Sequence, residues 1–386
     1  MKVRERFDLT YCSNIHAGES WAEVRRAIGA ALPEIRRLLD VTGPFAIGLR
    51  LSARAAEELA QPPTFEEFRG FLRDGNYYVP TFNGFPYGAF HRERVKERVY
   101  LPDWRDRARV AYSNRLASLL AVLLADRDLA QGSISTVPGA FKSEVKSEDD
   151  IRRIAAGILD HVRHLIGLRR EYGVTVVLAI EPEPACFIET TAEAIDFFSH
   201  YLFTSEVVDV EDVKHHVGIC FDACHMAVEF EDAASSLEQL AAARIRVPKF
   251  QISSALKISN PLEGSSGRRA LATFADDTYL HQVVECREGR LSRYVDLPDA
   301  LSTAGCSNCE WRVHFHVPVF LATMGALETT QRDLEAVLNL IKQRPDPACL
   351  EVETYTWDVL PPEYRNLDMT AAIARELKWT RDRLEA

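Results

Sequence analysis

Short apolar runs alternate with long amphipathic segments along most of this 386-residue chain. Segment 149–172 shows the amphipathic pattern best, because Ile151, Ile154, Ile158 and Val162 recur at helical spacing. Strands separated by helices are typical of parallel sheets in α/β proteins. We interpret these runs as buried strands: 7–12, 45–51, 77–82, 133–137, 174–180, 217–221, 249–252 and 349–353. Helices are predicted at 21–39, 53–59, 65–72, 105–124, 149–172, 191–202 and 330–342.

Eight strand–helix units predict a (β/α)8 TIM barrel, which usually takes about 250 residues. The extra length is placed in two insertions, about 83–104 after the third strand and about 253–345 between the seventh and eighth strands. A doubly wound open sheet is the alternative. The glycine-rich turn that would favour it is missing after the first strand, where the chain reads TYCSNIHAGES. We therefore expect residues 1–386 to form one α/β barrel domain.

Charge and hydropathy exclude several classes of protein. Lys and Arg number 46 against 57 Asp and Glu, and no basic block interrupts the net charge of −11, so a nucleic-acid partner is not expected. No apolar stretch is long enough for a membrane span. The N-terminal MKVRERFDLT lacks an apolar signal segment, which predicts a cytoplasmic location. The eight cysteines are expected as free thiols in a reducing compartment.

Polar side chains follow the predicted strands at the ends where a TIM barrel places its active site. Glu181 comes directly after the fifth strand, and Pro182 keeps it extended. Asp222 and His225 follow the sixth strand, three residues apart, so both can face the barrel mouth. An Asp–His pair of this kind suits a divalent metal, although Asp222 also suits a helix N-cap.

Further candidates lie in the C-terminal half of the chain. Gln251 ends the seventh strand, where its amide is either a weak metal ligand or a hydrogen-bonding core group. His314 and His316 point to one face if the run 311–317 is extended. Glu353 lies at the end of the last strand, and Glu351, on the same face, is an inner-barrel alternative.

Nitrogen and oxygen donors at one barrel mouth suit Mn, Zn, Fe or Mg. A structural zinc site is an alternative, because Cys306 and Cys309 have C-x2-C spacing and precede the two histidines of WRVHFHVPV. The residues expected to contact a substrate are His16, Asn83, Tyr87 and His281. The loop NGFPYG, which contains Asn83 and Tyr87, either stacks on a ring-shaped substrate or is a packed turn.

The order of these strand-end residues resembles the xylose isomerase-like TIM barrel superfamily, which includes sugar-phosphate isomerases, epimerases and endonuclease IV-type enzymes. Longer segments resemble the EboE family of bacterial "metabolite traffic" proteins, and this resemblance covers nearly the whole chain. Those segments are TYCSNIHAGESW, GLRLSARAAEEL, TFNGFPYGAFH, VKERVYLPDW and GSISTVPGAFK.

The resemblance implies one divalent metal held by Glu, Asp, His and Glu. Glu181, Asp222 and Glu353 match the first, second and fourth of these ligands, and Gln251 stands where the histidine is expected. The chain thus departs from the simple epimerase pattern at one ligand.

The endonuclease-like branch implies additional ligands. It has a histidine three residues after the Asp, which His225 matches. It also has a D-x-H pair, which His314-Phe-His316 resembles with His in place of Asp. The resemblance therefore also implies an alternative site with two metals.

Three functions follow as hypotheses. The first is a metal-dependent isomerase or epimerase, with Glu181 and Glu353 as acid and base and His225 polarising a substrate oxygen. Its substrate would be a sugar or cyclitol, with or without phosphate, in a metabolite biosynthesis or export pathway. The second is a two-metal phosphoester hydrolase. The third is a non-catalytic metabolite-binding protein that uses the barrel mouth. A homodimer is a further hypothesis, because barrels of this kind often dimerise.

Overall fold

The computed structural model describes residues 1–85, 96–275, 279–354, 360 and 368–386. Its main sheet has the strand order β1-β2-β15-β8-β7-β6-β5-β4-β3. The neighbours from β2 to β3 in this order pair in parallel, and a parallel bridge between Cys12 and Gly48 brings the two ends of the sheet together. This arrangement confirms the predicted TIM barrel. The strands are β1 (Lys2–Val3), β2 (Phe7–Tyr11), β3 (Phe45–Arg50), β4 (Tyr77–Asn83), β5 (Gln131–Thr136), β6 (Thr175–Ile180), β7 (Val217–Asp222), β8 (Arg246–Ile252) and β15 (Ala348–Val352).

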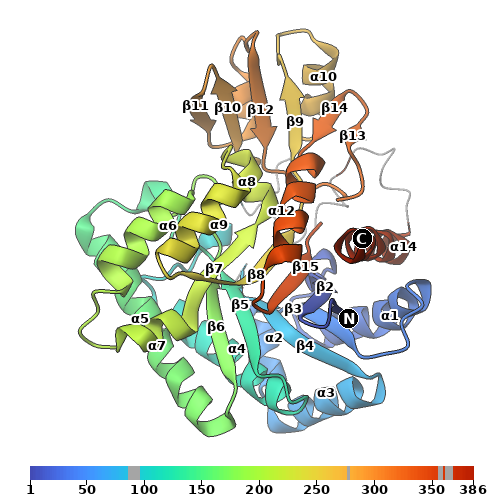
Figure 1. Cartoon of the computed structure of the whole chain (residues 1–386), viewed down its shortest axis with the longest axis vertical. Coiled ribbons are helices and arrows are strands. Elements are labelled where there is room, and N and C mark those ends of the chain that lie inside the picture. The colour runs from blue at the N-terminus through green and yellow to red at the C-terminus, as the bar shows by residue number, and fades with distance from the viewer. Residues whose placement is uncertain (86–95, 276–278, 355–359, 361–367) are drawn as a thin grey trace.

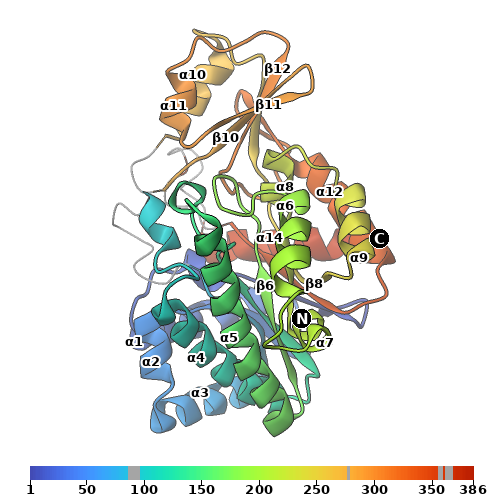
Figure 2. The ribbon, with the colours of Figure 1, turned by 90° about the vertical axis from the view of Figure 1, so that its left-hand side faces the viewer.

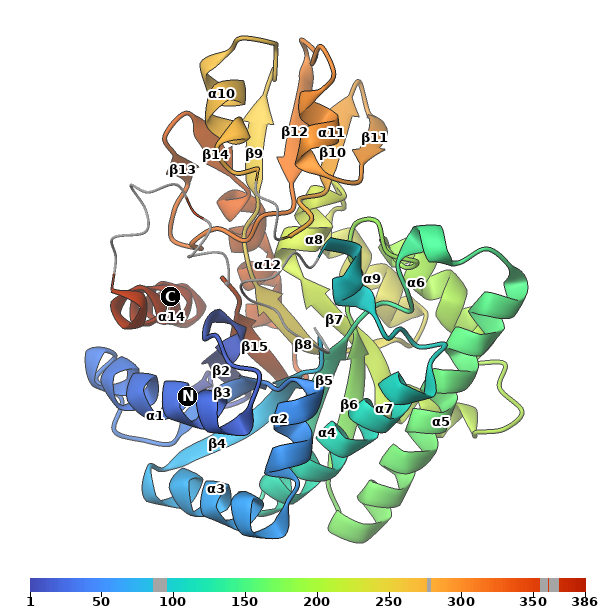
Figure 3. The ribbon, with the colours of Figure 1, turned by 180° about the vertical axis from the view of Figure 1, so that it is seen from behind.

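Helices surround the barrel sheet (Figures 1 and 3). In α5, Ser147 accepts a hydrogen bond from the Asp150 amide at the N-terminus, and Gly173 ends the helix at a φ of 71°. No helix in the described part of the chain has the length and hydropathy to cross a membrane. The helices are α1 (Trp21–Leu38), α2 (Ala53–Leu59), α3 (Pro62–Asp74), α4 (Arg107–Ala125), α5 (Glu148–Tyr172), α6 (Thr191–Phe197), α7 (Val210–His216), α8 (Ala223–Val228), α9 (Ala233–Ala242), α12 (Gln331–Gln343) and α14 (Met369–Glu385). Short helical turns are η1 (Ser13–Ile15), η2 (Lys96–Tyr100), η3 (Lys142–Glu144) and η4 (Phe198–Leu202).

A second sheet, which we call the accessory sheet, projects from the barrel between β8 and α12 (Figures 1 and 2). It is antiparallel, with the order β11-β10-β12-β9-β14-β13. Of the predicted run 311–317, only the first part is strand, because β12 ends at Val313. The elements are β9 (Leu256–Ser259), α10 (Ser266–Ala272), β10 (Val283–Arg287), β11 (Arg290–Tyr294), α11 (Leu297–Leu301), β12 (Cys309–Val313), β13 (Thr323–Met324) and β14 (Leu327–Thr329).

A buried ion pair fills the barrel interior below the strand ends. Lys249 Nζ lies 2.5 Å from Glu351 Oε2, and both side chains are fully buried. The ammonium also donates to Ser135 Oγ at 3.1 Å. Gly48 makes room for the carboxylate, since a Cβ at that position would lie 1.7 Å from Glu351 Oε1. Glu351 is therefore an inner-barrel group, as its alternative interpretation expected.

The cysteines differ in one respect from the prediction of free thiols. Cys306 and Cys309 form a disulfide, while Cys12, Cys186, Cys220, Cys224, Cys286 and Cys349 are free. The two paired sulfur atoms lie near a Glu285 oxygen and belong to no group with His314 and His316. The structural zinc interpretation of these two cysteines is therefore wrong for this structure: their sulfurs are bonded to each other.

Helix α14 carries one buried carboxyl group. Glu376 is 1% exposed among the apolar residues that pack α14 against the barrel. Its Oε1 accepts hydrogen bonds from the Val319 amide at 3.1 Å and from Thr354 Oγ1 at 2.7 Å. Burial raises the pKa of Glu376 to about 7.

This raised pKa predicts a specific dependence of stability on pH. The folded chain keeps a proton on Glu376 that the unfolded chain loses between pH 4.5 and about 7, so the free energy of unfolding falls as pH rises through that window. A shift of this size corresponds to a fall on the order of 3 kcal/mol. Urea unfolding of the wild type and of Glu376→Gln at pH 5, 6, 7 and 8 should show a shallower fall in the variant. Equal slopes would contradict this assignment.

Candidate metal centre

Three carboxylates meet at the carboxyl ends of β6, β7 and β15. Glu181, Asp222 and Glu353 each offer an oxygen, and these atoms lie within 4.8 Å of one another. The Glu181 amide donates to the Thr136 carbonyl, and the Glu353 amide donates to the Ile252 carbonyl, so both residues extend the sheet ladder by one bond. The parallel barrel thus fixes the backbone on which this carboxylate group stands.

The carboxylate group leaves buried oxygens without partners. Asp222 Oδ1 accepts from the His225 amide at 3.0 Å and from Ser253 Oγ at 2.7 Å. Its Oδ2 and Glu181 Oε2 are buried and have no hydrogen-bond partner among the described residues. Burial, and then the charge of Asp222, raises the pKa of Glu181 to about 7. Burial, and then the charge of Glu181, raises the pKa of Glu353. A divalent cation fits here, because it would satisfy the orphaned oxygens and lower the repulsion.

Gln251 occupies the strand between two of these carboxylates. It lies on β8 in register with Asp222 on β7 and with Glu351 on β15. It is fully buried, and neither end of its side-chain amide has a hydrogen-bond partner in the part of the chain that the structure describes. An amide oxygen at this position suits a fourth ligand better than a satisfied core group.

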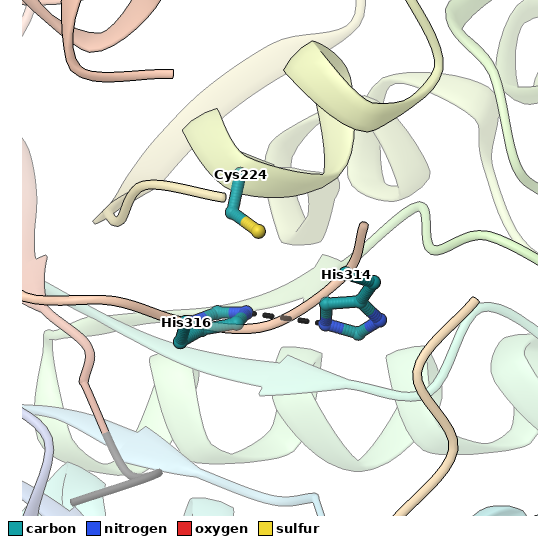
Figure 4. Close-up of side chains that lie close together, drawn as sticks. All are labelled: Cys224, His314 and His316. Atoms are coloured by element: carbon teal, nitrogen blue, oxygen red, sulfur yellow. Dashed lines mark hydrogen bonds between the residues drawn. The ribbon is translucent and has the colours of Figure 1, made fainter. Parts of the chain in front are cut away.

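Three histidines form a second group of donors beside the carboxylates. His225 Nε2 lies 3.0 Å from His314 Nε2, which lies 3.2 Å from His316 Nε2 (Figure 4 shows the second pair). Asp222 Oδ2 is 3.7 Å from His225 Nε2, so Asp222 borders both groups. Cys224 points toward the two imidazoles in Figure 4, and burial raises the pKa of its thiol, which keeps it protonated.

The second ring nitrogen of each histidine defines its tautomer. Each Nδ1 lies 2.7–2.9 Å from an oxygen. These oxygens are the Pro182 carbonyl for His225, Gln282 Oε1 for His314 and the Glu353 carbonyl for His316. An oxygen of this type only accepts, so Nδ1 carries the proton and Nε2 presents a lone pair. Gln282 faces His314 with its oxygen because its amide nitrogen donates to the Pro184 carbonyl at 3.0 Å.

The facing lone pairs indicate a second cation position. Burial lowers the pKa of His316 to about 4 and that of His314 well below its ordinary value, so both rings are neutral at pH 7. For His225, burial lowers the pKa, but nearby carboxylates, Asp222 foremost, outweigh it and raise the pKa. A proton on His225 Nε2 would form a hydrogen bond only to His314, the first of the two contacts between the rings. The neutral His314–His316 pair remains, and convergent imidazole lone pairs are typical of metal ligands.

Asparagine and glutamate side chains that the sequence analysis missed complete the centre. Asn14 Nδ2 donates to Glu353 Oε1 at 2.7 Å. Glu183 accepts from Tyr100 Oη at 2.8 Å, and burial raises its pKa to about 7. Glu183 could have been found, because it alternates with Glu181 in the run EPEP. Asn14 and Gln282 carry no comparable signal.

Members of both donor groups line one cavity of about 40 Å³. Its lining contains Asn14, Glu181, Glu183, Glu353 and the three histidines, together with Phe85, Lys96, Val99, Tyr100, Tyr279 and Leu280. Lys96 donates to Asp296 Oδ2 at 2.6 Å and to the Tyr279 carbonyl at 2.8 Å, so its charge is balanced. The lining therefore combines candidate metal ligands with aromatic and apolar groups.

The predicted substrate contacts have different positions. Asn83 reaches the centre, where its Nδ2 lies 3.3 Å from Glu353 Oε1. His16 lies 3.1 Å from Tyr11 Oη and is not among the residues lining the cavity. His281 packs against Phe315, next to the lining residue Leu280. Tyr87 lies outside the described residues.

Comparisons with known proteins agree with this architecture. No curated protein matches the sequence. A xylose isomerase-like TIM barrel protein from Mycobacterium smegmatis in complex with magnesium is 12% identical, with 100% of this chain and 99% of that chain covered and a TM-score of 0.51. The D-allulose 3-epimerase from Methylomonas sp. in complex with D-allulose is 13% identical (99% and 99% covered, TM-score 0.49). The IOLI protein with a zinc atom is 13% identical (98% and 98%, TM-score 0.49).

The matched family covers most of the barrel. The family model of the xylose isomerase-like TIM barrel matches residues 44–303, a span that includes β3 to β8 and the strand ends that carry Glu181, Asp222 and Gln251. The resemblance to the xylose isomerase-like superfamily is thereby confirmed. This chain belongs to the xylose isomerase-like TIM barrel family.

Proposed function

We propose that this protein is a divalent-metal-dependent isomerase or epimerase that acts on a sugar or a cyclitol, with or without phosphate. One observation carries the proposal: the buried side chains of Glu181, Asp222 and Glu353 converge, and two of their oxygens have no hydrogen-bond partner among the described residues. Membership in the xylose isomerase-like family supports it. The resemblance to EboE-type proteins stays a prediction, and it would place the reaction in a metabolite biosynthesis or export pathway.

The chain provides a ligand set for the cation. Glu181, Asp222, Glu353 and the amide oxygen of Gln251 would hold it, and this donor set suits Mn, Zn, Fe or Mg. When bound, the cation supplies Lewis acidity toward adjacent carbonyl and hydroxyl oxygens of the substrate. Ser253 and the His225 amide hold Asp222 Oδ1, which leaves Oδ2 for ligation.

Glu181 and Glu353 are placed to move the proton. Glu181 would take it from carbon with the carboxylate oxygen that the cation leaves free. Asn14 and Asn83 donate to Glu353 Oε1, so Oε2 of Glu353 remains to return a proton. Coordination of a cation would keep the Glu181 carboxylate ionised at neutral pH, the form that a general base needs. His225, anchored through Nδ1 and with a raised pKa, would donate from Nε2 to a substrate oxygen in its protonated form.

The decisive experiment is exchange of a carbon-bound proton with solvent. Ketohexoses, ketopentoses and inososes, free and phosphorylated, are incubated in D2O with the Mn²⁺-loaded protein and followed by proton NMR. Deuterium is expected at the carbon next to the carbonyl, and Glu181→Gln should slow the exchange by about 10²–10⁴-fold.

Glu231→Gln is the matched control. Burial raises the pKa of Glu231 to about 7 as well, but Glu231 bonds Thr191 and stands outside the centre. This variant should keep the exchange rate. Full exchange in Glu181→Gln would contradict the assigned base. Tight ligand binding without any exchange would favour the non-catalytic metabolite-binding function.

The histidine group favours a second candidate, metal-assisted hydrolysis of a phosphoester. His225, His314 and His316 offer a second set of ligands bordering Asp222, and two adjacent metals can hold an attacking water. Hydrolysis of bis(p-nitrophenyl) phosphate together with two equivalents of bound metal would support this function. One equivalent with proton exchange would support the isomerase.

A further inference from the structure

Two irregular segments of the chain meet at the metal centre. Residues 314–319 follow β12 and carry two histidines, and residues 353–354 follow β15 and carry Glu353. Neither segment lies in a helix or a strand. His316 Nδ1 contacts the Glu353 carbonyl at 2.9 Å, so the two segments depend on each other. Regular secondary structure alone therefore does not hold these ligands in place.

A single oxygen on α14 joins the two segments from outside the centre. Glu376 Oε1 accepts from the Val319 amide at 3.1 Å and from Thr354 Oγ1 at 2.7 Å. Val319 lies three residues after His316, and Thr354 directly follows Glu353. All three contacting residues are buried. Glu376 therefore contacts the chain close to one proposed ligand of each donor group, His316 and Glu353.

The surroundings of Glu376 make a role in general packing a poor explanation. Its buried neighbours on α14 include Ile373 and Leu377, and an apolar side chain at this position would avoid the desolvation of a carboxyl group. The carboxyl group supplies what an apolar side chain lacks, an acceptor for two donors at once. Without it, the Val319 amide and the Thr354 hydroxyl would be left buried without these bonds.

We propose that Glu376 is a positioning residue of the metal centre, which fixes the His316 and Glu353 segments relative to each other through one shared oxygen. The proposal rests on the proposed function insofar as the centre binds a divalent cation. Partners behind the ligands of a metal commonly change its affinity by about 10–100-fold. Glutamine keeps the accepting oxygen, whereas alanine removes it. Metal affinity should therefore fall when the accepting oxygen is removed and should be kept when only the ionisable group is removed.

The test is calorimetric titration of the full-length protein with Mn²⁺. Glu376→Ala should raise the Kd by about 10–100-fold, and Glu376→Gln should stay within about threefold of the wild type. Thr354→Val removes one of the two bonds and should have an intermediate effect, which keeps the test available if the alanine variant does not fold. In Glu376→Ala/Thr354→Val the two effects should not add, because both act through the same bond.

Leu377→Ala is the matched control. Leu377 is a fully buried neighbour on α14 that makes no hydrogen bond to either segment, so its truncation lowers stability without touching the centre. The Kd of this variant should stay within about threefold of the wild type. An unchanged Kd in Glu376→Ala, or an equal change in both alanine variants, would overturn the positioning role.

Hydrogen exchange tests the positioning role of Glu376 even if the protein proves not to bind a metal. A wild type that binds no Mn²⁺ would remove the metal function. The positioning role is then decided on the metal-free proteins by the exchange of amides 311–320. Faster exchange in Glu376→Ala than in Leu377→Ala would support it, and equal exchange would overturn it.

Discussion

Replacing Asp222 by asparagine is expected to weaken metal binding by about 10²–10⁴-fold and to abolish turnover with it. Asp222 borders both donor groups, since it lies with Glu181 and Glu353 on one side and with His225 and His316 on the other. Losing this charge is comparable to breaking a buried ion pair, which costs about 3–5 kcal/mol. Each 1.4 kcal/mol is about tenfold in Kd.

The asparagine variant distinguishes the role of Asp222 as a proposed metal ligand from its role as a helix cap. Asp222 is also the N-cap of α8, and asparagine caps about as well as aspartate. Asp232→Asn is the control, because Asp232 caps α9 by accepting from the Ser235 amide at 2.8 Å and stands outside the centre. Elemental mass spectrometry and Mn²⁺ titration should show the loss in Asp222→Asn alone. Retention of metal there would remove the ligand assignments.

Removal of the metal is expected to lower the melting temperature by about 5 °C relative to protein at a free metal concentration of about 1,000 times Kd. Binding at that excess stabilises the folded chain by about 4 kcal/mol. In a chain of this length each kcal/mol shifts Tm by roughly 1.2 °C. The physical reason is local: the His314 and His316 Nε2 atoms lie 3.2 Å apart, and with both rings protonated at Nδ1 a cation would accept both lone pairs.

Thermal unfolding before and after chelation with EDTA, followed by addition of Mn²⁺ or Zn²⁺, measures this effect. His314→Gln should show a smaller metal-dependent shift. His161→Gln should show the full shift, because His161 is a buried histidine of lowered pKa that bonds Asn114, away from the centre. A melting temperature that chelation leaves unchanged would contradict a cation between these imidazoles.

The barrel could be predicted from the sequence because buried parallel strands are continuous apolar runs. Each run ends at the first polar residue. That rule found Glu181, Asp222 and Glu353, which do converge. It did not find the accessory sheet, because strands such as β11 are short and largely exposed and so lack an apolar run. Their pairing depends on partners distant in sequence.

The residues missed at the centre share one physical cause. Gln282 enters from the start of β10, and Asn14 lies in the turn after β2. Glu376 enters from a helix that follows all the strands. Each contact exists only once separate parts of the fold are packed together, and no spacing along the chain records that packing. The expectation that polar residues after an apolar run lie at the barrel mouth finds only residues located at a strand end.

The pairing of β15 has a consequence for the order of biosynthesis. This strand is the last of the barrel along the chain, yet it lies between β2, near the N-terminus, and β8. A nascent chain on the ribosome therefore keeps both β2 and β8 as open edges until residues 348–352 emerge. Because Glu353 follows the same strand, the proposed ligands come together only after β15 has emerged. Loading of a metal at this site would thus follow closure of the barrel and would not nucleate it.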